Sequence, residues 1–171
     1  MSGLPVDRTA EASVAGETRF PRLALGVYVL LVAYASLHPL SGWRDPGTPA
    51  LAFLTAPLPR WVTPFDVVSN VLGYLPLGAL CTLALHPRWK GFAAILAALT
   101  CGAGLSVVLE TAQTFLPARV PSNLDVLANA AGALAGGIVG VLLGPRFLGR
   151  GPLRRLRAHT ITAGTEAELG L

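Results

Sequence analysis

The sequence predicts an all-helical integral membrane protein, a four-helix bundle built from two antiparallel hairpins. Three observations predict this fold. Hydrophobic residues make up 53% of the 171 residues and charged residues only 13%, whereas a typical soluble domain has about 25% charged residues. The mean hydropathy is +0.59. Four apolar runs each approach the roughly 20 residues that a helix needs to cross a bilayer.

These runs define a membrane domain of residues 20–146. The expected helices cover about residues 20–39, 65–85, 91–116 and 123–144. Residues 1–19 are polar and of mixed charge, so we expect a disordered cytoplasmic tail there. Residues 147–171 form a second, basic cytoplasmic tail.

Basic residues predict the orientation of the bundle. Ten of the 13 Lys and Arg residues precede the first run, separate the second from the third, or follow the fourth. Because positively charged segments stay on the cytoplasmic side, we expect a multi-pass protein of the cytoplasmic membrane with both termini in the cytoplasm. The basic C-terminal tail is expected to lie against anionic headgroups. It has no interleaved aromatics or binding motif that would indicate nucleic acid.

Residues 40–64 are expected to form an outer loop rich in proline. Its apolar middle, Ala50–Leu58, is too short to cross a bilayer. We expect this middle to lie on the membrane surface or to dip into it, where it is the best candidate for a lid.

One pattern occurs twice, 59 residues apart. Asp66–Gly73 and Asp125–Gly132 both read D-V-x-x-N-x-x-G, at the start of the second and fourth helices. Asp, Asn and Gly at these spacings share one face of a helix. The two hairpins are therefore expected to be related by a pseudo-twofold axis along the membrane normal, as in parallel transporter repeats.

Small residues in the fourth run predict close helix packing. Gly132, Gly136, Gly140 and Gly144 are spaced four apart, so another helix can approach this stripe closely. The partner helix belongs either to the same chain or to a second copy. A homodimer through Gly132, Gly136 and Gly140 is therefore one expectation.

Polar side chains are expected to form one layer near the outer face. The third span contributes two residues in its last turns, each repeat contributes an Asp and an Asn, and an arginine lies in the loop between. The expected ligand-binding residues are Asp66, Asn70, Glu110, Gln113, Arg119, Asp125 and Asn129. Ionisable groups within a span are costly to desolvate and indicate function by default. Carboxylates clustered in a poorly hydrated layer suit proton chemistry or the binding of a cationic headgroup.

A structural explanation accounts for part of this layer. Asp is a favoured residue at helix N-termini, and Asn forms hydrogen bonds between membrane helices. An ion pair of Glu110 with Arg119 would likewise be structural. Cys81 and Cys101 fall within different spans and indicate small apolar residues rather than a disulfide or a metal site.

The sequence resembles the VanZ-like family, named after a glycopeptide (teicoplanin) resistance protein, from about Tyr34 to Gly144. Three blocks carry the resemblance. The first contains Tyr34, Ser36, Leu37 and Pro39; the second contains Asp66, Asn70, Pro76, Leu77 and Gly78; the third contains Glu110, Gln113, Phe115, Pro117, Arg119, Ser122, Asp125, Asn129, Gly132 and Gly136. The resemblance implies a small helical protein of the cell envelope. It also implies a family-level effect on glycopeptide susceptibility.

Three functions fit these observations. The first is non-enzymatic binding of a lipid headgroup or of a lipid-linked envelope molecule, with no cofactor and no metal. The second is an enzyme acting on a lipid-linked substrate, with Glu110, Asp125 or Asp66 as general acid or base. The absence of G-x-S-x-G, H-E-x-x-H and metal-spaced Cys or His weighs against it. The third is proton-coupled transport, for which four helices are few. We favour the first.

Overall fold

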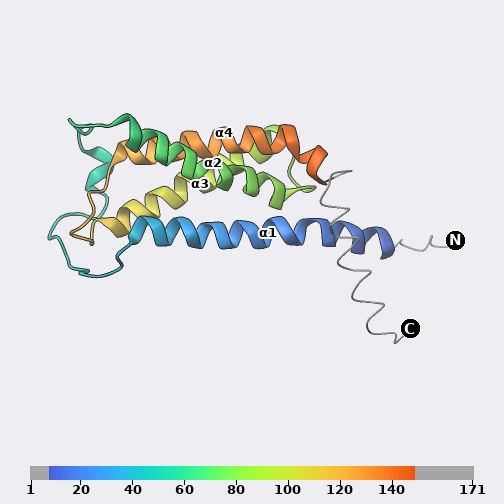
Figure 1. Cartoon of the computed structure of the whole chain (residues 1–171), viewed down its shortest axis with the longest axis horizontal. Helices are drawn as coiled ribbons and strands as arrows, with labels where there is room; N and C mark the ends of the chain where they lie inside the picture. The colour runs from blue at the N-terminus through green and yellow to red at the C-terminus, as the bar shows by residue number, and fades with distance from the viewer. Residues whose placement is uncertain (1–7, 149–171) are drawn as a thin grey trace.

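The computed structural model describes residues 8–148, with side chains described for residues 19–144. All secondary structure in this range is helical. The elements are α1 (Arg8–Leu37), the 3-10 turn η1 (Ala52–Thr55), α2 (Pro64–Leu85), α3 (Gly91–Gln113) and α4 (Asn123–Leu148). The four α-helices lie side by side and successive helices run in opposite directions (Figure 1). We call the end that carries residues 38–63 and 114–122 the loop end.

Each α-helix contains a segment long and apolar enough to cross a membrane. These segments are Arg19–Leu37, Pro64–Leu85, Gly91–Gln113 and Asn123–Gly144. The predicted all-helical fold class is therefore confirmed, with four helices that are long and apolar enough to cross a membrane.

The largest differences from the expected boundaries are in α1, α3 and α4. α4 continues to Leu148, four residues beyond the expected residue 144. α1 begins at Arg8, so residues 8–19 are helical where a disordered tail was expected. Ala10, Glu11 and Ala12 are strong helix formers, and they extend the apolar helix that follows them. α3 ends at Gln113 rather than near residue 116. Residues 1–7 and most of the predicted C-terminal tail lie outside the described residues.

The glycine stripe of α4 packs against α2 of the same chain. A Cβ atom on Gly132 would collide with the Val71 carbonyl oxygen, and one on Gly136 would collide with the Leu75 carbonyl oxygen. Gly140 is equally close to α2. Because this surface is used within the chain, a homodimer through the stripe would have to displace α2.

Ala133 is the point where three helices meet. It is 0% exposed, and its backbone lies against Gly78 of α2 while its methyl group lies against Gly102 of α3. A side chain on either glycine would collide with Ala133, so small residues are what allow α2, α3 and α4 to pack this closely.

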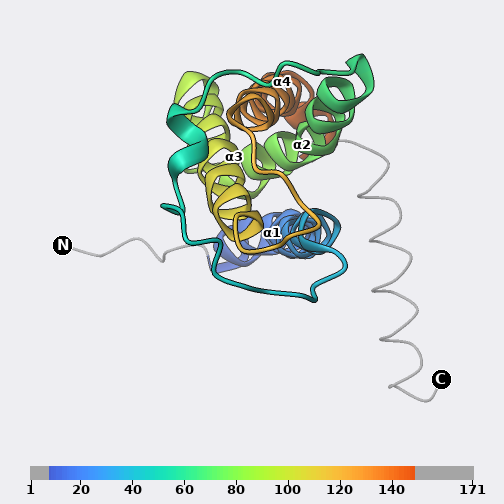
Figure 2. The same cartoon turned by 90° about the vertical axis from the view of Figure 1, so that its left-hand side faces the viewer.

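α1 is the most exposed of the four spans, since only 6% of its apolar membrane-spanning stretch is buried within the protein. It lies against α2 and α3, beneath them in the end-on view (Figure 2). Two hydrogen bonds reach α2: Arg22 Nε donates to the Ala84 carbonyl at 3.2 Å, and the Tyr28 hydroxyl donates to the Gly73 carbonyl at 3.0 Å. α1 is therefore attached at a few points, in contrast to the continuous contact of α2 with α4.

The segment between α1 and α2 is held on the ends of α3 and α4. Phe53 of η1 is 6% exposed, and η1 contacts α4. The Thr114 hydroxyl donates to the Ala50 carbonyl at 3.1 Å, and the Asn123 amide donates to the Ala56 carbonyl at 2.7 Å. These contacts fix the apolar middle of the loop on the protein, a docking that the sequence did not predict.

Candidate functional site

A cavity of about 560 Å³ lies within the loop end, and we call it the main cavity. All four α-helices and the connection between α3 and α4 contribute to its lining. Six of the seven expected ligand-binding residues line it: Asn70, Glu110, Gln113, Arg119, Asp125 and Asn129. The structure therefore brings most of the predicted polar layer to one place.

Asp66 is the expected residue that does not line the main cavity. It lines a second cavity of about 330 Å³, whose lining shares Asn70 and Asp125 with the main cavity. Asp66 is exposed and forms a capping box with Thr63 at the start of α2: the Asp66 N–H donates to Thr63 Oγ1 at 3.1 Å, and the Thr63 N–H donates to Asp66 Oδ2 at 3.2 Å. Helix capping explains this aspartate.

Glu110 is buried near the end of α3, with 4% of its surface exposed. Its Oε2 accepts a hydrogen bond from the backbone N–H of Ser122 at 2.8 Å. Ser122 directly precedes α4, so the carboxylate lies at the N-terminus of that helix, where the helix dipole favours negative charge. A charge-assisted bond and a helix N-terminus together make a buried carboxylate tolerable here.

Asn129 lies about two turns further along α4 than this contact and is 5% exposed. Its Nδ2 donates to the Ser106 hydroxyl oxygen on α3 at 2.9 Å. Its Oδ1 is buried and has no hydrogen-bond partner among the described residues. Such an acceptor is costly unless something else donates to it.

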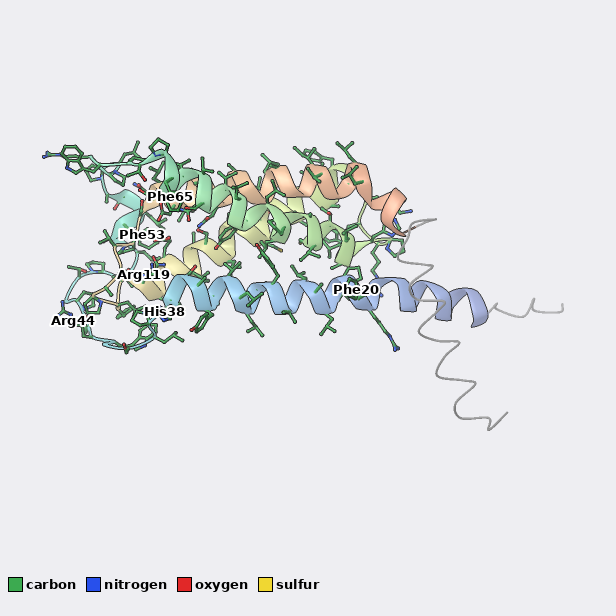
Figure 3. All side chains as sticks on the ribbon, in the orientation of Figure 1. Phe20, His38, Arg44, Phe53, Phe65 and Arg119 are labelled. Atoms are coloured by element: carbon green, nitrogen blue, oxygen red, sulfur yellow. The ribbon has the colours of Figure 1, made fainter. Side chains whose placement is uncertain are left out.

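Gln113 and Arg119 attach α1 to the site. Gln113 Nε2 donates to the Ser36 carbonyl at 3.0 Å. Arg119 Nη2 donates to the carbonyls of Ala35 at 3.0 Å and His38 at 2.9 Å, and its Nε also donates to His38 at 3.2 Å. Arg119 and His38 lie together at the end of α1 (Figure 3). The arginine thus satisfies carbonyls that the helix C-terminus leaves without partners.

These partners replace the ion pair that was considered for Glu110 and Arg119. Glu110 accepts from a backbone N–H and Arg119 donates to backbone carbonyls. The two residues hold different helices, α4 and α1, at the two sides of the main cavity.

Asp125 is half-buried and lines both cavities. The Asn70 amide of α2 lies beside its carboxylate. Asp125 is therefore the more accessible of the two carboxylates of the main cavity, since Glu110 is buried.

Sequence reasoning assigned no role to Tyr28, Ser36 or Tyr74, which also line the main cavity. It also gave no separate role to Ser122. The spacing Ser122-x-x-Asp125 fits a capping box and marks Ser122 as a helix N-cap, but it points to Asp125 rather than Glu110 as the partner of its N–H. Within residues 19–144 no group of three or more His, Cys, Asp or Glu side chains could hold a metal ion.

Comparison with known proteins agrees with the resemblance of the sequence. No curated protein and no solved structure matches the chain. A family model described as VanZ/LLP1 matches residues 6–144, a range that contains all four membrane-spanning segments and both cavities. The chain therefore belongs to the VanZ/LLP1 family.

Proposed function

We propose that this protein binds a lipid headgroup, or the headgroup part of a lipid-linked envelope molecule, in the main cavity. One observation carries the proposal: a cavity within a membrane-spanning bundle is lined by carboxylate and amide side chains from α2, α3 and α4 and by an arginine from the connection between α3 and α4. Such groups are rare in membrane spans and usually serve a ligand or an ion.

The position of the opening of the main cavity supports the proposal that the ligand enters from the bilayer. The exposed lining residues include Leu31 and Ala35 on α1, Ser69 on α2, and Val120. Leu31 lies six residues before the end of α1, about 9 Å along the helix. Gly73, which also lines the cavity, lies about 13 Å from the start of α2. An opening at this depth between two spans faces lipid as well as water.

The proposal includes an orientation. With both termini in the cytoplasm, as the basic residues favour, the loop end lies at the outer face of the cytoplasmic membrane. A headgroup bound there would belong to the outer leaflet. Retention of a lipid-linked envelope molecule at that face is a physical route to the family-level effect on glycopeptide susceptibility.

Lipid retention tests the proposal directly. The protein is reconstituted in nanodiscs of phosphatidylethanolamine, phosphatidylglycerol and a polyprenyl phosphate. Native mass spectrometry then identifies and quantifies the lipid that stays bound to the protein. We expect one tightly held lipid in the wild type, with retention reduced on the order of tenfold in Asp125→Asn. Asp125 has few contacts to lose, so the thermal unfolding of this variant is expected to stay near that of the wild type.

Asp45→Asn is the matched control. Asp45 lies at the same end of the molecule, its carboxylate accepts a bond from the Gly47 N–H at 2.9 Å, and it lines neither cavity. It is expected to retain lipid like the wild type. Equal retention in Asp125→Asn, Glu110→Gln and Asp45→Asn would contradict the proposal and leave the polar layer a structural feature.

A further inference from the structure

We infer that the main cavity selects a headgroup in which a primary ammonium group lies next to a phosphate, as in phosphatidylethanolamine. This inference rests on the proposed function and adds the chemical class of the ligand. The inference is drawn by separating the hydrogen-bonding groups of the cavity that already have partners in the protein from those that do not.

Three acceptor groups on α3 and α4 keep oxygen atoms that are open to a donor. Asn129 Oδ1 is an acceptor that lies buried with no donor among the residues described. Glu110 uses its Oε2 on the Ser122 N–H, which leaves Oε1, and the Asp125 carboxylate has the Asn70 amide beside it, which leaves one of its two oxygens. Ionised carboxylates and amide oxygens accept and do not donate. A ligand that fits this wall must therefore bring N–H or O–H donors.

Charge narrows the choice of donor. The main cavity is lined by two carboxylates, Glu110 and Asp125, and by one arginine. A positive ligand group offsets the cost of burying a second carboxylate. A primary ammonium carries this charge together with three N–H donors, which can serve Asn129 Oδ1, Glu110 Oε1 and the second oxygen of Asp125. A trimethylammonium group has the charge but no N–H, and a glycerol group has donors but no charge.

The opposite wall accommodates the phosphate. Arg119 lines the main cavity and is bonded to α1 through Nε and Nη2. Its Nη1 makes no hydrogen bond within the described chain. Arginine is suited to phosphate because its planar donors match phosphate oxygens. A headgroup that spans the cavity would direct its phosphate toward α1 and its ammonium toward α3 and α4.

The simplest competing explanation is that a water molecule, rather than a lipid headgroup, donates the missing hydrogen bond to Asn129 Oδ1. Water would satisfy Oδ1 without any preference among headgroups. The selectivity of the wild-type protein therefore separates the two explanations, and it does so without a variant.

The experiment compares lipids that share acyl chains and differ in headgroup. Wild-type protein in nanodiscs of equimolar phosphatidylethanolamine, phosphatidylcholine and phosphatidylglycerol is released for native mass spectrometry. We expect phosphatidylethanolamine to be retained on the order of tenfold over each of the others, since one missing charge-assisted hydrogen bond costs about that factor. Asp125→Asn is expected to lose this preference, and Asp45→Asn is expected to keep it.

The outcomes distinguish this inference from the function on which it rests. Equal retention of all three lipids, or displacement of phosphatidylethanolamine by an equal amount of amine-free polyprenyl phosphate, would overturn the ammonium selectivity and leave headgroup binding standing. No retained lipid in the wild type would overturn both. A preference for phosphatidylethanolamine that survives in Asp125→Asn and in Glu110→Gln would also overturn the inference, because it would not come from this wall.

Discussion

The first turns of α2 and α4 share a sequence pattern but differ in how their aspartates are used. At α2, the N-cap residue Thr63 donates its backbone N–H to Asp66, three residues later. At α4, the equivalent N–H of Ser122 donates to Glu110, which belongs to α3. Asp125, the counterpart of Asp66, therefore has no capping role and lines the main cavity.

The difference shows that a side chain from a neighbouring helix can take over the capping bond, which leaves the aspartate of the helix itself free to line a cavity. Both starts have the hydroxyl residue and the aspartate of a capping box. Only α4 has a buried glutamate beside it to replace the aspartate. Within the pair of repeats, the copy that lies against Glu110 is the one whose carboxylate is left available to a ligand.

The largest contrast is expected at the glycines that end the two repeats. Gly132→Ala places a methyl group on the Val71 backbone and should destabilise the protein by about 3 kcal/mol or more. Gly73→Ala meets nothing within 4 Å and should be neutral or stabilising by up to about 1 kcal/mol. Thermal unfolding in detergent measures both. Equal effects would show that the two repeats pack alike after all.

A double-mutant cycle tests the exchange of caps. In Glu110→Ala the Ser122 N–H becomes available to Asp125, so the loss should be limited to about 1 kcal/mol. Asp125→Ala alone should cost less than about 0.5 kcal/mol. The double variant has neither partner and should lose about 2–3 kcal/mol, more than the sum. Simple additivity in the unfolding measurements would mean that Asp125 does not replace Glu110.

The variant Asp66→Ala tests the capping box at the start of α2, in which Asp66 still accepts the Thr63 N–H. Loss of its half of the capping box should destabilise α2 by about 1 kcal/mol. Phosphatidylethanolamine retention should not change, because Asp66 lies outside the main cavity. Reduced retention without reduced stability would place Asp66 in the binding site and would remove the contrast with Asp125.

The smallest expected effect concerns the two asparagines. The bond between Asn129 and Ser106 should give a coupling energy of about 0.6 kcal/mol in a cycle of alanine substitutions, the usual size between membrane helices. The same cycle with Asn70 in place of Asn129 should give no measurable coupling, since the described hydrogen bonds do not include one between Asn70 and Ser106. Equal coupling energies would argue that the asparagines of the two repeats are equivalent.

Hydropathy and helical periodicity predict most of the fold and the side chains of the layer. The four spans follow from apolar length, and the shared face of Ser106, Glu110 and Gln113 follows from their spacing. The partner of Glu110 is a backbone N–H, which leaves no trace in side-chain identity, so an ion pair with Arg119 was considered instead. The glycine stripe predicts close packing but not its partner, because glycine fits a helix of its own chain or of another copy equally well.

The close contact of α2 with α4 and the apolar cluster beneath the main cavity have one more consequence. Gly132, Gly136 and Gly140 bring α4 onto the backbone of α2. Leu25 and Val29 of α1 pack against the buried cluster of Tyr74, Leu77 and Ala133. Within the described residues, packed apolar side chains therefore lie between the main cavity and the end of the bundle opposite the loop end. The polar lining is confined to the half of the bundle next to the loop end.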